Sequence, residues 1–512
     1  MRHVLRWVTG GLIACGASQA HAAWYEAKST HFVIYADDKP EKLQAFAQRL
    51  ERFDQAVRLL RGTEDPPLTD SNRLRIYVLD SEKAVWKLLG RSTASGMYRS
   101  TMAGSVAFVP RTAGSSYTYL DLDAEQIFFH EYAHHLQLQY NAVAMPPWLR
   151  EGFAEFFATA VFGKDGSVTI GKYPGYRLQG LYNSYGLTVP QIVSGSYGPL
   201  SIFGLNALYG WGWLLVHYLS FDDSRRGQLD KFVQGIQAGL GEEDAAKAAF
   251  GDLGKLDHDA HRYMRGALKM IVLKPALFSD APMTIRPLSA GESAIMPVSI
   301  ESNRGVDQKS APEVAAQARE AAGPYPGDPF VQAVLAEAEY DAAEYAAADA
   351  AADRALAADP NNVHALIYKG RAQTALAKQR GSADWTKIRQ YYLRANKIDP
   401  ENPEPLALYY FSFLTADQKP SRNAVDALLY AVVLAPQDIV TRFAAVRELI
   451  QENKFEEAKS MFAPLAYQPH VQPEAREGLA KIMRAISDGD SERALGLLGG
   501  SDKTNAGVSQ PR

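Results

Sequence analysis

The sequence has almost no cysteine, with Cys15 the only one among 512 residues. A single cysteine excludes an intramolecular disulfide and a cysteine-rich zinc module. An excess of positive charge is lacking too: 54 lysine and arginine residues are outnumbered by 58 aspartate and glutamate residues, for a formal net charge of −4. A chain without a basic field is poorly suited to binding nucleic acid, so we expect no nucleic-acid partner. Any metal site must then use histidine, aspartate and glutamate.

The composition lacks the extremes that mark fibrous, disordered or membrane-embedded chains. Hydrophobic residues make up 47% and charged residues 22% of the sequence, which is ordinary for a soluble globular protein. A largely disordered chain, a collagen-like chain and a multi-span membrane protein are therefore excluded. At 512 residues the chain is several times longer than a typical domain of about 150 residues, which predicts at least two cores.

Residues 1–22 have the features of a secretory signal peptide. They begin with two arginines, continue through an apolar stretch and end in the small-x-small triplet AHA at 20–22. The segment LIAC at 12–15 also resembles a bacterial lipobox, in which Cys15 would become the lipidated first residue. Both interpretations predict a bacterial envelope location. The protein would be periplasmic or secreted after simple cleavage, and attached to a membrane only if Cys15 is lipidated.

The first half of the mature chain alternates between strand and helix patterns. Strands are predicted at 31–35, 73–79 and 104–110, and apolar residues at helical spacing predict a helix over 40–61. A long helix is predicted over 124–140, and the pattern is mainly helical from 205 to 268. Interleaved strands and helices followed by a helical part indicate an α+β domain over residues 23–270.

The next segments differ in composition from this domain. Residues 271–310 contain four prolines and short apolar runs, which predicts a connecting segment with some strand content. Residues 501–512 are predicted to form a flexible tail.

Residues 311–500 are alanine-rich and repetitive. Ala348, Ile388, Ala424 and Ala458 occupy one packing position at spacings of 40, 36 and 34 residues. This pattern resembles the tetratricopeptide repeat (TPR) family, whose 34-residue unit is a pair of helices. No repeat carries the tryptophan of the family's first helix, and residues 379–384 look like an insertion. The resemblance implies an all-α solenoid that binds a substrate or a protein partner, and a generic helical bundle is the alternative.

A zinc-binding motif lies within the predicted helix over 124–140. His130, Glu131 and His134 form the pattern HExxH. Histidines at i and i+4 share one helical face, so both imidazoles can bind one zinc ion. Glu131 is placed to accept a proton from an attacking water as general base. His135 is turned about 100° from its neighbour, which places it outside the predicted ligand set.

A second acidic pair follows in the segment PPWLREGFAEFF at 146–157. Glu151 and Glu155 are also at i and i+4, on an otherwise apolar helix where unpaired carboxylates are costly to bury. Together with HExxH, this segment resembles the gluzincin metallopeptidases, and 148–154 resembles the aminopeptidase N pattern. The resemblance implies a thermolysin-like fold with Glu151 as third zinc ligand. It implies that Glu155 orients a ligand imidazole.

Two further features bear on catalysis and substrate. Tyr209 opens an apolar helix, and the aminopeptidase resemblance implies that its hydroxyl stabilises the oxyanion. An ordinary core tyrosine is the alternative.

The aminopeptidases bind the substrate's free amine through a glutamate on a strand that corresponds to 104–110. That strand has no acidic residue here. An extended peptide could still pair with it, which favours an endopeptidase over an aminopeptidase.

The sequence therefore predicts an exported zinc metallopeptidase that hydrolyses peptide bonds in a peptide or protein substrate, followed by TPR-like repeats for substrate or partner binding. Two alternatives stay open. One is a catalytically inactive envelope scaffold in which the repeats carry the function. The other is a zinc amidase acting on non-peptide or cell-wall amides, since the same activated water serves both reactions.

Overall fold

The computed structural model describes residues 24–65, 68–90, 96–111, 124–140, 145–183, 186–466 and 473–504. The predicted signal peptide at 1–22, with Cys15, lies outside these ranges. The predicted flexible tail at 501–512 is corrected at its start, because the last helix continues to Thr504. Residues 505–512 lie outside the described part. Within the described ranges, no helix combines the length and apolar character needed to cross a membrane.

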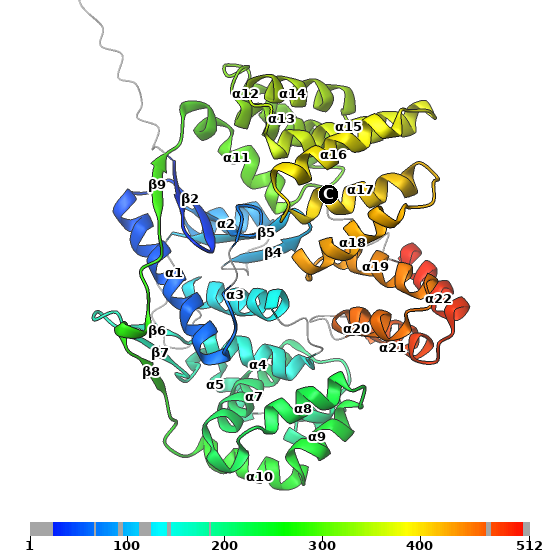
Figure 1. The fold of residues 1–512 in the computed structure, drawn as a ribbon. Helices are drawn as coiled ribbons and strands as arrows, with labels where there is room; N and C mark the ends of the chain where they lie inside the picture. The colour runs from blue at the N-terminus through cyan, green and yellow to red at the C-terminus, as the bar shows by residue number, and fades with distance from the viewer. Residues whose placement is uncertain are drawn as a thin grey trace, which may run out of the picture.

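A six-stranded mixed sheet forms the centre of the first half (Figure 1). Its order is β4-β5-β3-β2-β1-β9, with β4 at one edge and β9 at the other. Strands β2, β3 and β5 are parallel, while β1, β4 and β9 each pair antiparallel to their neighbours. The strands are β1 (Tyr25–Lys28), β2 (Phe32–Ala36), β3 (Leu74–Leu79), β4 (Met97–Thr101), β5 (Gly104–Pro110) and β9 (Thr284–Pro287).

Helices cover both faces of this sheet. On one face lie α1 (Pro40–Arg61) and α3 (Ala124–Tyr140), whose Phe53 and Phe129 rings stack at 4.1 Å. On the other lie α2 (Glu82–Leu89) and α11 (Ala290–Arg304). Burying α3 against the sheet fixes the helix that carries HExxH.

A helical layer and a small sheet extend the first half beyond α3. Helix α4 packs closely against α7, and α7 packs against α5. The three-stranded sheet has the order β6-β7-β8. The elements are α4 (Pro147–Ala158), β6 (Val161–Phe162), β7 (Val168–Ile170), α5 (Leu178–Asn183), α6 (Val189–Ser194), α7 (Ile202–Phe221), α8 (Gln228–Gln237), α9 (Glu242–Phe250), α10 (Leu253–Met264) and β8 (Ile271–Leu273).

The segment 271–310 differs from the predicted connecting segment. It supplies β8 to the small sheet and β9 to the edge of the large one, and then forms α11. Met296 and Ile300 of α11 are buried against Tyr77 and Phe108 of the sheet. Helix α11 shares this sheet face with α2, and its Ile295 and Val298 pack against α12 and α13 of the second half. The segment 271–310 is therefore part of the core that joins the two halves and does not separate them.

The second half is an array of paired helices, in agreement with the predicted TPR-like repeats. Each helix packs against the next. The four predicted packing positions, Ala348, Ile388, Ala424 and Ala458, are all buried near the start of the second helix of a pair. The helices are α12 (Ala311–Ala322), α13 (Pro329–Asp341), α14 (Tyr345–Ala358), α15 (Val363–Arg380), α16 (Trp385–Ile398), α17 (Pro403–Thr415), α18 (Arg422–Leu434), α19 (Ile439–Gln451), α20 (Phe455–Ala466), α21 (Pro473–Ser487) and α22 (Ser491–Thr504). The predicted insertion at 379–384 lies at the end of α15 and in the loop to α16.

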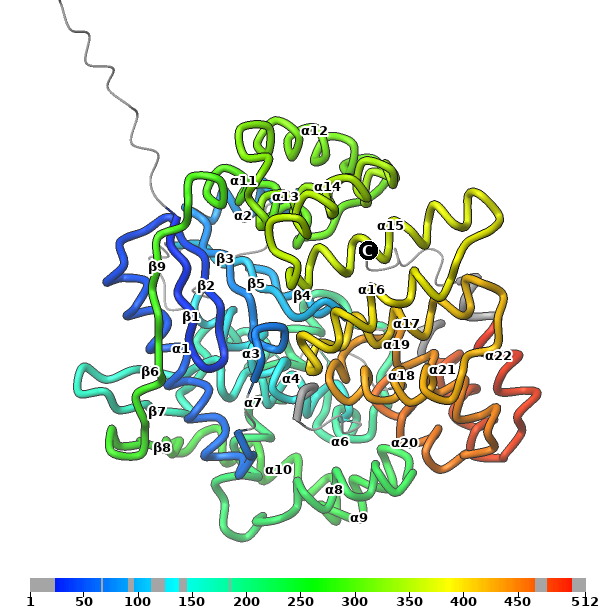
Figure 2. The backbone as a smooth tube through the Cα atoms, turned by 45° about the horizontal axis from the view of Figure 1, so that its top comes forward, coloured from blue at the N-terminus to red at the C-terminus, as the bar shows by residue number. Residues whose placement is uncertain are grey.

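The array lies beside the end of the sheet where β4 and β5 are joined (Figures 1 and 2). Met102, at the turn between β4 and β5, packs among Leu406, Ala407 and Ala431 of α17 and α18. Farther along the array, the Thr441 hydroxyl of α19 lies 3.5 Å from the Met102 sulfur. The turn of the β4–β5 hairpin therefore packs against the array, and the two halves share an interface.

Candidate metal centre

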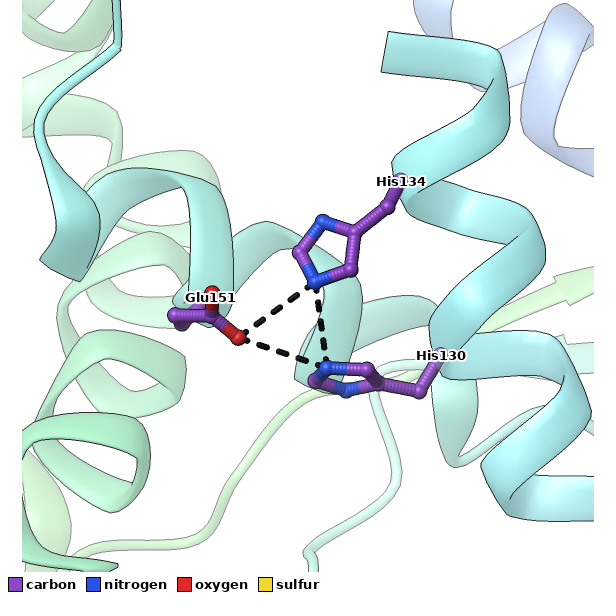
Figure 3. Close-up of side chains that lie close together, drawn as sticks. All are labelled: His130, His134 and Glu151. Atoms are coloured by element: carbon purple, nitrogen blue, oxygen red, sulfur yellow. Dashed lines mark hydrogen bonds and ion pairs between the residues drawn. The ribbon is translucent and has the colours of Figure 1, made fainter. Parts of the chain in front are cut away.

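Two helices bring the predicted metal ligands together. Helix α3 presents His130 and His134 one turn apart, and α4 presents Glu151 opposite them (Figure 3). The approach of α4 to α7 depends on two glycines. A Cβ on Gly152 would lie 2.3 Å from the backbone oxygen of Gly212, so only glycine allows the two helices to approach this closely.

The three ligand atoms form a nearly equilateral triangle. The two Nε2 atoms of His130 and His134 are 3.1 Å apart, and each lies 3.3 Å from Oε2 of Glu151 (Figure 3). Zinc bonds of about 2.0–2.1 Å in a tetrahedron separate neighbouring ligand atoms by about 3.3 Å. The triangle therefore has the dimensions of one face of a zinc tetrahedron, and its three residues form a possible metal-binding group.

Glu151 provides a test of whether the residues fit a metal. Its side chain is 2% exposed, and among the described residues neither carboxylate oxygen has a hydrogen-bond partner. A buried carboxylate without hydrogen bonds is costly unless a cation compensates it. Two imidazoles and one such carboxylate match a catalytic zinc donor set, so the residues fit zinc.

The electrostatics of the centre oppose the effect of burial. Burial favours the neutral form of His130, but the carboxylates Glu151, Glu155 and Glu131 raise its pKa to about 9. Burial likewise favours the neutral form of Glu151, but His134 and His130 hold its pKa well below the usual range. A metal ion bound here would therefore replace the proton that His130 holds beside the ionised carboxylate.

Gln137 orients His134 and was missed in the sequence analysis. Its amide oxygen lies 3.1 Å from Nδ1 of His134, and its amide nitrogen donates to the backbone oxygen of Arg150 at 3.3 Å. This fixes the imidazole with Nε2 toward the centre. The i, i+3 spacing on the same helix was the signal that could have identified it.

Glu155 lies behind His130 and is completely buried. Its Oε1 is 3.5 Å from Nδ1 of His130. Tyr176 donates to Oε2 at 2.8 Å, and Arg177 donates to Oε1 from Nε at 2.9 Å. Burial alone would raise the pKa of Glu155, but Arg177 and His130 lower it. This arrangement suits a residue that orients the ligand imidazole, and neither Tyr176 nor Arg177 has a sequence pattern that marks it.

Tyr209 and Glu131 lie beside the triangle. The Tyr209 ring is 6.2 Å from that of His130, and the Arg177 guanidinium lies over it at 4.8 Å. Burial and the charge of Glu151 raise the pKa of Tyr209, and Glu131 adds to the effect. Tyr209 does not open its helix as predicted, because Ser201 caps α7 well before it by accepting a hydrogen bond from the backbone of Gly204 at 3.2 Å.

His135 faces away from the centre, as expected from its place on the helix. Its Nδ1 lies 2.8 Å from the hydroxyl of Tyr98 on β4. This contact ties the HExxH helix to the sheet edge.

A second group of potential ligands consists of His31, Asp54 and Asp65. His31 already lies 2.7 Å from Glu51 through Nδ1 and 2.8 Å from Asp65 through Nε2. Asp54 accepts hydrogen bonds from Arg58 at 2.7 Å and Tyr132 at 2.8 Å. Their polar atoms pair with one another, which makes this group a structural network.

Comparisons with known proteins find only remote structural similarity. No protein-family model and no curated protein matches the sequence. Among solved structures, Pseudomonas aeruginosa PilF is 20% identical, with a TM-score of 0.32, over 41% of this chain and 88% of its own. TTC0263, a thermophilic TPR protein of Thermus thermophilus, is 16% identical, with a TM-score of 0.32, over 37% of this chain and 97% of its own. The TPR-like character of the second half rests on its own paired helices.

Proposed function

We propose that this protein is an exported zinc metallopeptidase of the gluzincin type. The observation that carries the proposal is the triangle of His130, His134 and Glu151, with edges of 3.1–3.3 Å and a buried carboxylate that lacks hydrogen-bond partners among the described residues. The same three residues are the ones that the HExxH pattern and the following glutamate predict.

The neighbouring side chains have separate tasks in hydrolysis. When bound, zinc supplies a Lewis acid that polarises the scissile carbonyl and acidifies the attacking water. Glu131 accepts the proton of that water and delivers it to the leaving amine. Tyr209 donates a hydrogen bond to the developing oxyanion, and its raised pKa keeps the hydroxyl protonated for this purpose. Glu155 holds the imidazole of His130 in position.

The sheet edge bears on the substrate class. The strand 104–110, proposed from sequence to pair with substrate, is β5, and it already pairs with β3 and β4. The edge position belongs to β4, whose sequence MYRST also has no carboxylate. A substrate strand added there would find no anion for its free amine, so an endopeptidase remains favoured.

The TPR-like array favours a second candidate, an envelope scaffold whose repeats bind a protein partner. Stacked helix pairs commonly serve this purpose by presenting extended surfaces. A scaffold has no requirement for Glu131 or for a compensating cation at Glu151. A zinc amidase acting on cell-wall or other non-peptide amides shares the whole centre with a peptidase and is separated from it by substrate alone.

Metal analysis of the purified full-length protein tests the proposal. We expect one zinc per chain, because three ligands at tetrahedral spacing bind zinc tightly. Glu151→Ala should lose most of this zinc, while Glu313→Ala, at an exposed site in α12, should retain it. A wild-type protein that binds no zinc even after supplementation would favour the scaffold.

A further inference from the structure

A small polar cavity lies where the sheet edge meets the helical array. Its volume is about 50 Å³, and four arginines are among its lining residues: Arg73, Arg75, Arg99 and Arg371. Arg75 lies in β3, Arg73 directly precedes that strand, and Arg99 lies in β4. Arg371 lies in α15 of the array. Neither the metal centre nor the repeats account for this concentration of guanidinium groups.

The end of α11 holds two of these arginines in place. Asn303 accepts a hydrogen bond from Arg75 through its side chain at 3.0 Å, and from Arg99 through its backbone oxygen at 3.3 Å. Gly305 follows with φ of 96°, and a Cβ there would lie 2.4 Å from Arg99 Nη1. A glycine at this position leaves the space that the guanidinium occupies.

Ion pairs account for some of the charged side chains around the cavity. Arg371 pairs with Glu404, Arg73 with Asp70, and Glu337 lies 3.0 Å from His364. Arg75 and Arg99 have no carboxylate within 4.0 Å among the described residues. Burial lowers the pKa of Arg99, although Asp341 and Glu337 oppose this effect from a longer distance.

An additional donor lines the same cavity. Ser302 is 5% exposed, and its hydroxyl has no hydrogen-bond partner among the described residues. Buried hydroxyls normally have a partner, so this one marks a place where an acceptor fits.

We propose that this cavity binds one small tetrahedral oxyanion of the phosphate or sulfate class. Arg75 and Arg99 provide the planar donor forks that suit such an anion, and Ser302 provides a third donor. A cavity of about 50 Å³ accepts a group of this size and not a length of peptide. The anion would join α11 and the sheet to the wall formed by α15 and α17. The proposal does not depend on zinc or on peptidase activity.

Isothermal titration calorimetry of the full-length protein with inorganic phosphate, at constant ionic strength maintained with chloride, tests this site. We expect one saturable site per chain, with sulfate competing for it. Arg99→Gln should weaken binding about ten- to hundred-fold, because a charge-assisted hydrogen bond is lost. Arg226→Gln, at an exposed ion pair in the first half, should bind phosphate as the wild type does.

Two further variants keep the test decisive. Ser302→Ala removes one hydroxyl and should weaken binding several-fold even if Arg99→Gln fails to fold. Glu151→Ala should bind phosphate normally, because the metal centre is a separate site. The proposal is overturned if no saturable heat is seen, if neither Arg99→Gln nor Ser302→Ala weakens binding, or if Glu151→Ala abolishes it.

Discussion

At the scale of single residues, Glu131 and Glu151 are both close to the metal centre but have different surroundings. Glu151 is buried, and its Oε2 lies 3.3 Å from both histidine Nε2 atoms. Glu131 is partly exposed, and its charge contributes to the raised pKa values of His130 and Tyr209. The first arrangement suits a ligand, and the second suits a group that exchanges protons with water.

This difference predicts the outcome of Glu131→Gln. The variant should retain zinc, because no ligand is changed, and should lose about 10²–10⁴-fold in kcat/KM, as general-base removal typically does. Zinc content and hydrolysis of an N-acetylated peptide are measured together. Glu125→Gln is the matched control on the same helix, since Glu125 pairs with Arg49 at 2.8 Å. Equal cleavage by Glu131→Gln and wild type would contradict the role.

The sequence revealed the residues of this centre that belong to a known motif, and missed the side chains that orient them. His130 and His134 were predicted from the helical spacing of HExxH, and Glu151 from the resemblance of the segment 148–154 to the aminopeptidase N pattern. Arg177, in contrast, lies in the short 3₁₀ helix Gly175–Arg177 and contacts Glu155 only after the chain folds back. A periodic sequence pattern predicts contacts within one helix or strand, and it cannot predict a contact that forms only in the tertiary structure.

At the scale of elements, the contact between α4 and α7 sets the position of Glu151. Gly152→Ala should destabilise the protein by about 1–3 kcal/mol, because its Cβ would lie 2.3 Å from the backbone of Gly212 and force the helices apart. Gly478→Ala in α21 is the control, since no atom lies within 4 Å of its added Cβ. There, alanine should be neutral or stabilising by up to about 1 kcal/mol. Comparable denaturant midpoints for the two variants would show that the contact can relax.

The network around His31 joins β2 to α1 and reaches α3. Burial would lower the pKa of His31, but Glu51, Asp54 and Asp65 raise it to about 9. Tyr132 of α3 donates to Asp54 at 2.8 Å. A histidine whose pKa is higher in the folded than in the unfolded chain stabilises the fold below its unfolded value of about 6.5. That stability is lost as pH rises through 9.

The expected result is a fall of roughly 1–3 kcal/mol in the free energy of unfolding between pH 6.5 and pH 9.5 from this group. His31→Gln should flatten this part of the stability profile, measured by urea denaturation at each pH. His258→Gln should keep it, because the His258 side chain is 77% exposed. A wild-type profile that is flat over this range would mean that His31 is not charged in the folded protein.

Elements with a clear hydrophobic period were predicted well, and short edge elements were not. The helix over 40–61, the strand over 104–110 and the helix over 124–140 have the predicted bounds. Strand β9 has only four residues, is mostly exposed and pairs with a strand near the start of the chain, so its sequence carries little pattern. Helix α11 was not predicted because it contains Pro297, which normally breaks a helix, although the capping box of Ser289 and Glu292 marks its start.

At the scale of the whole molecule, the helical array packs against the sheet, so the two halves of the chain are not independent units. We expected the repeats to present a long surface to other proteins. The structure places the β4–β5 hairpin and the arginine-lined cavity against the first helices of successive pairs, α13, α15, α17 and α19. A partner of the array would therefore bind beside this interface, or compete with the hairpin for it.

The position of α11 changes where the chain can be divided. Truncation after residue 270, which the sequence pattern favoured, removes β9 from the sheet edge and α11 from its face. Tyr35, Tyr77 and Phe108, all buried beneath α11, would then be exposed to water. Apolar burial contributes about 25 cal/mol per Å², so exposing these three aromatic side chains removes several kcal/mol from a stability that is usually about 5–15 kcal/mol.

Two truncated chains test this division. Residues 23–270 should be insoluble or lack a cooperative thermal transition, whereas 23–310 should be soluble, unfold cooperatively and bind zinc, because both sheet faces stay covered. The comparison uses solubility, thermal unfolding and zinc content, with the full-length protein as control. If 23–270 unfolds cooperatively as a monomer, α11 belongs with the array. If 23–310 also fails to fold, the array is needed to complete the sheet, since Met102 and the arginines of β3 and β4 lose their partners.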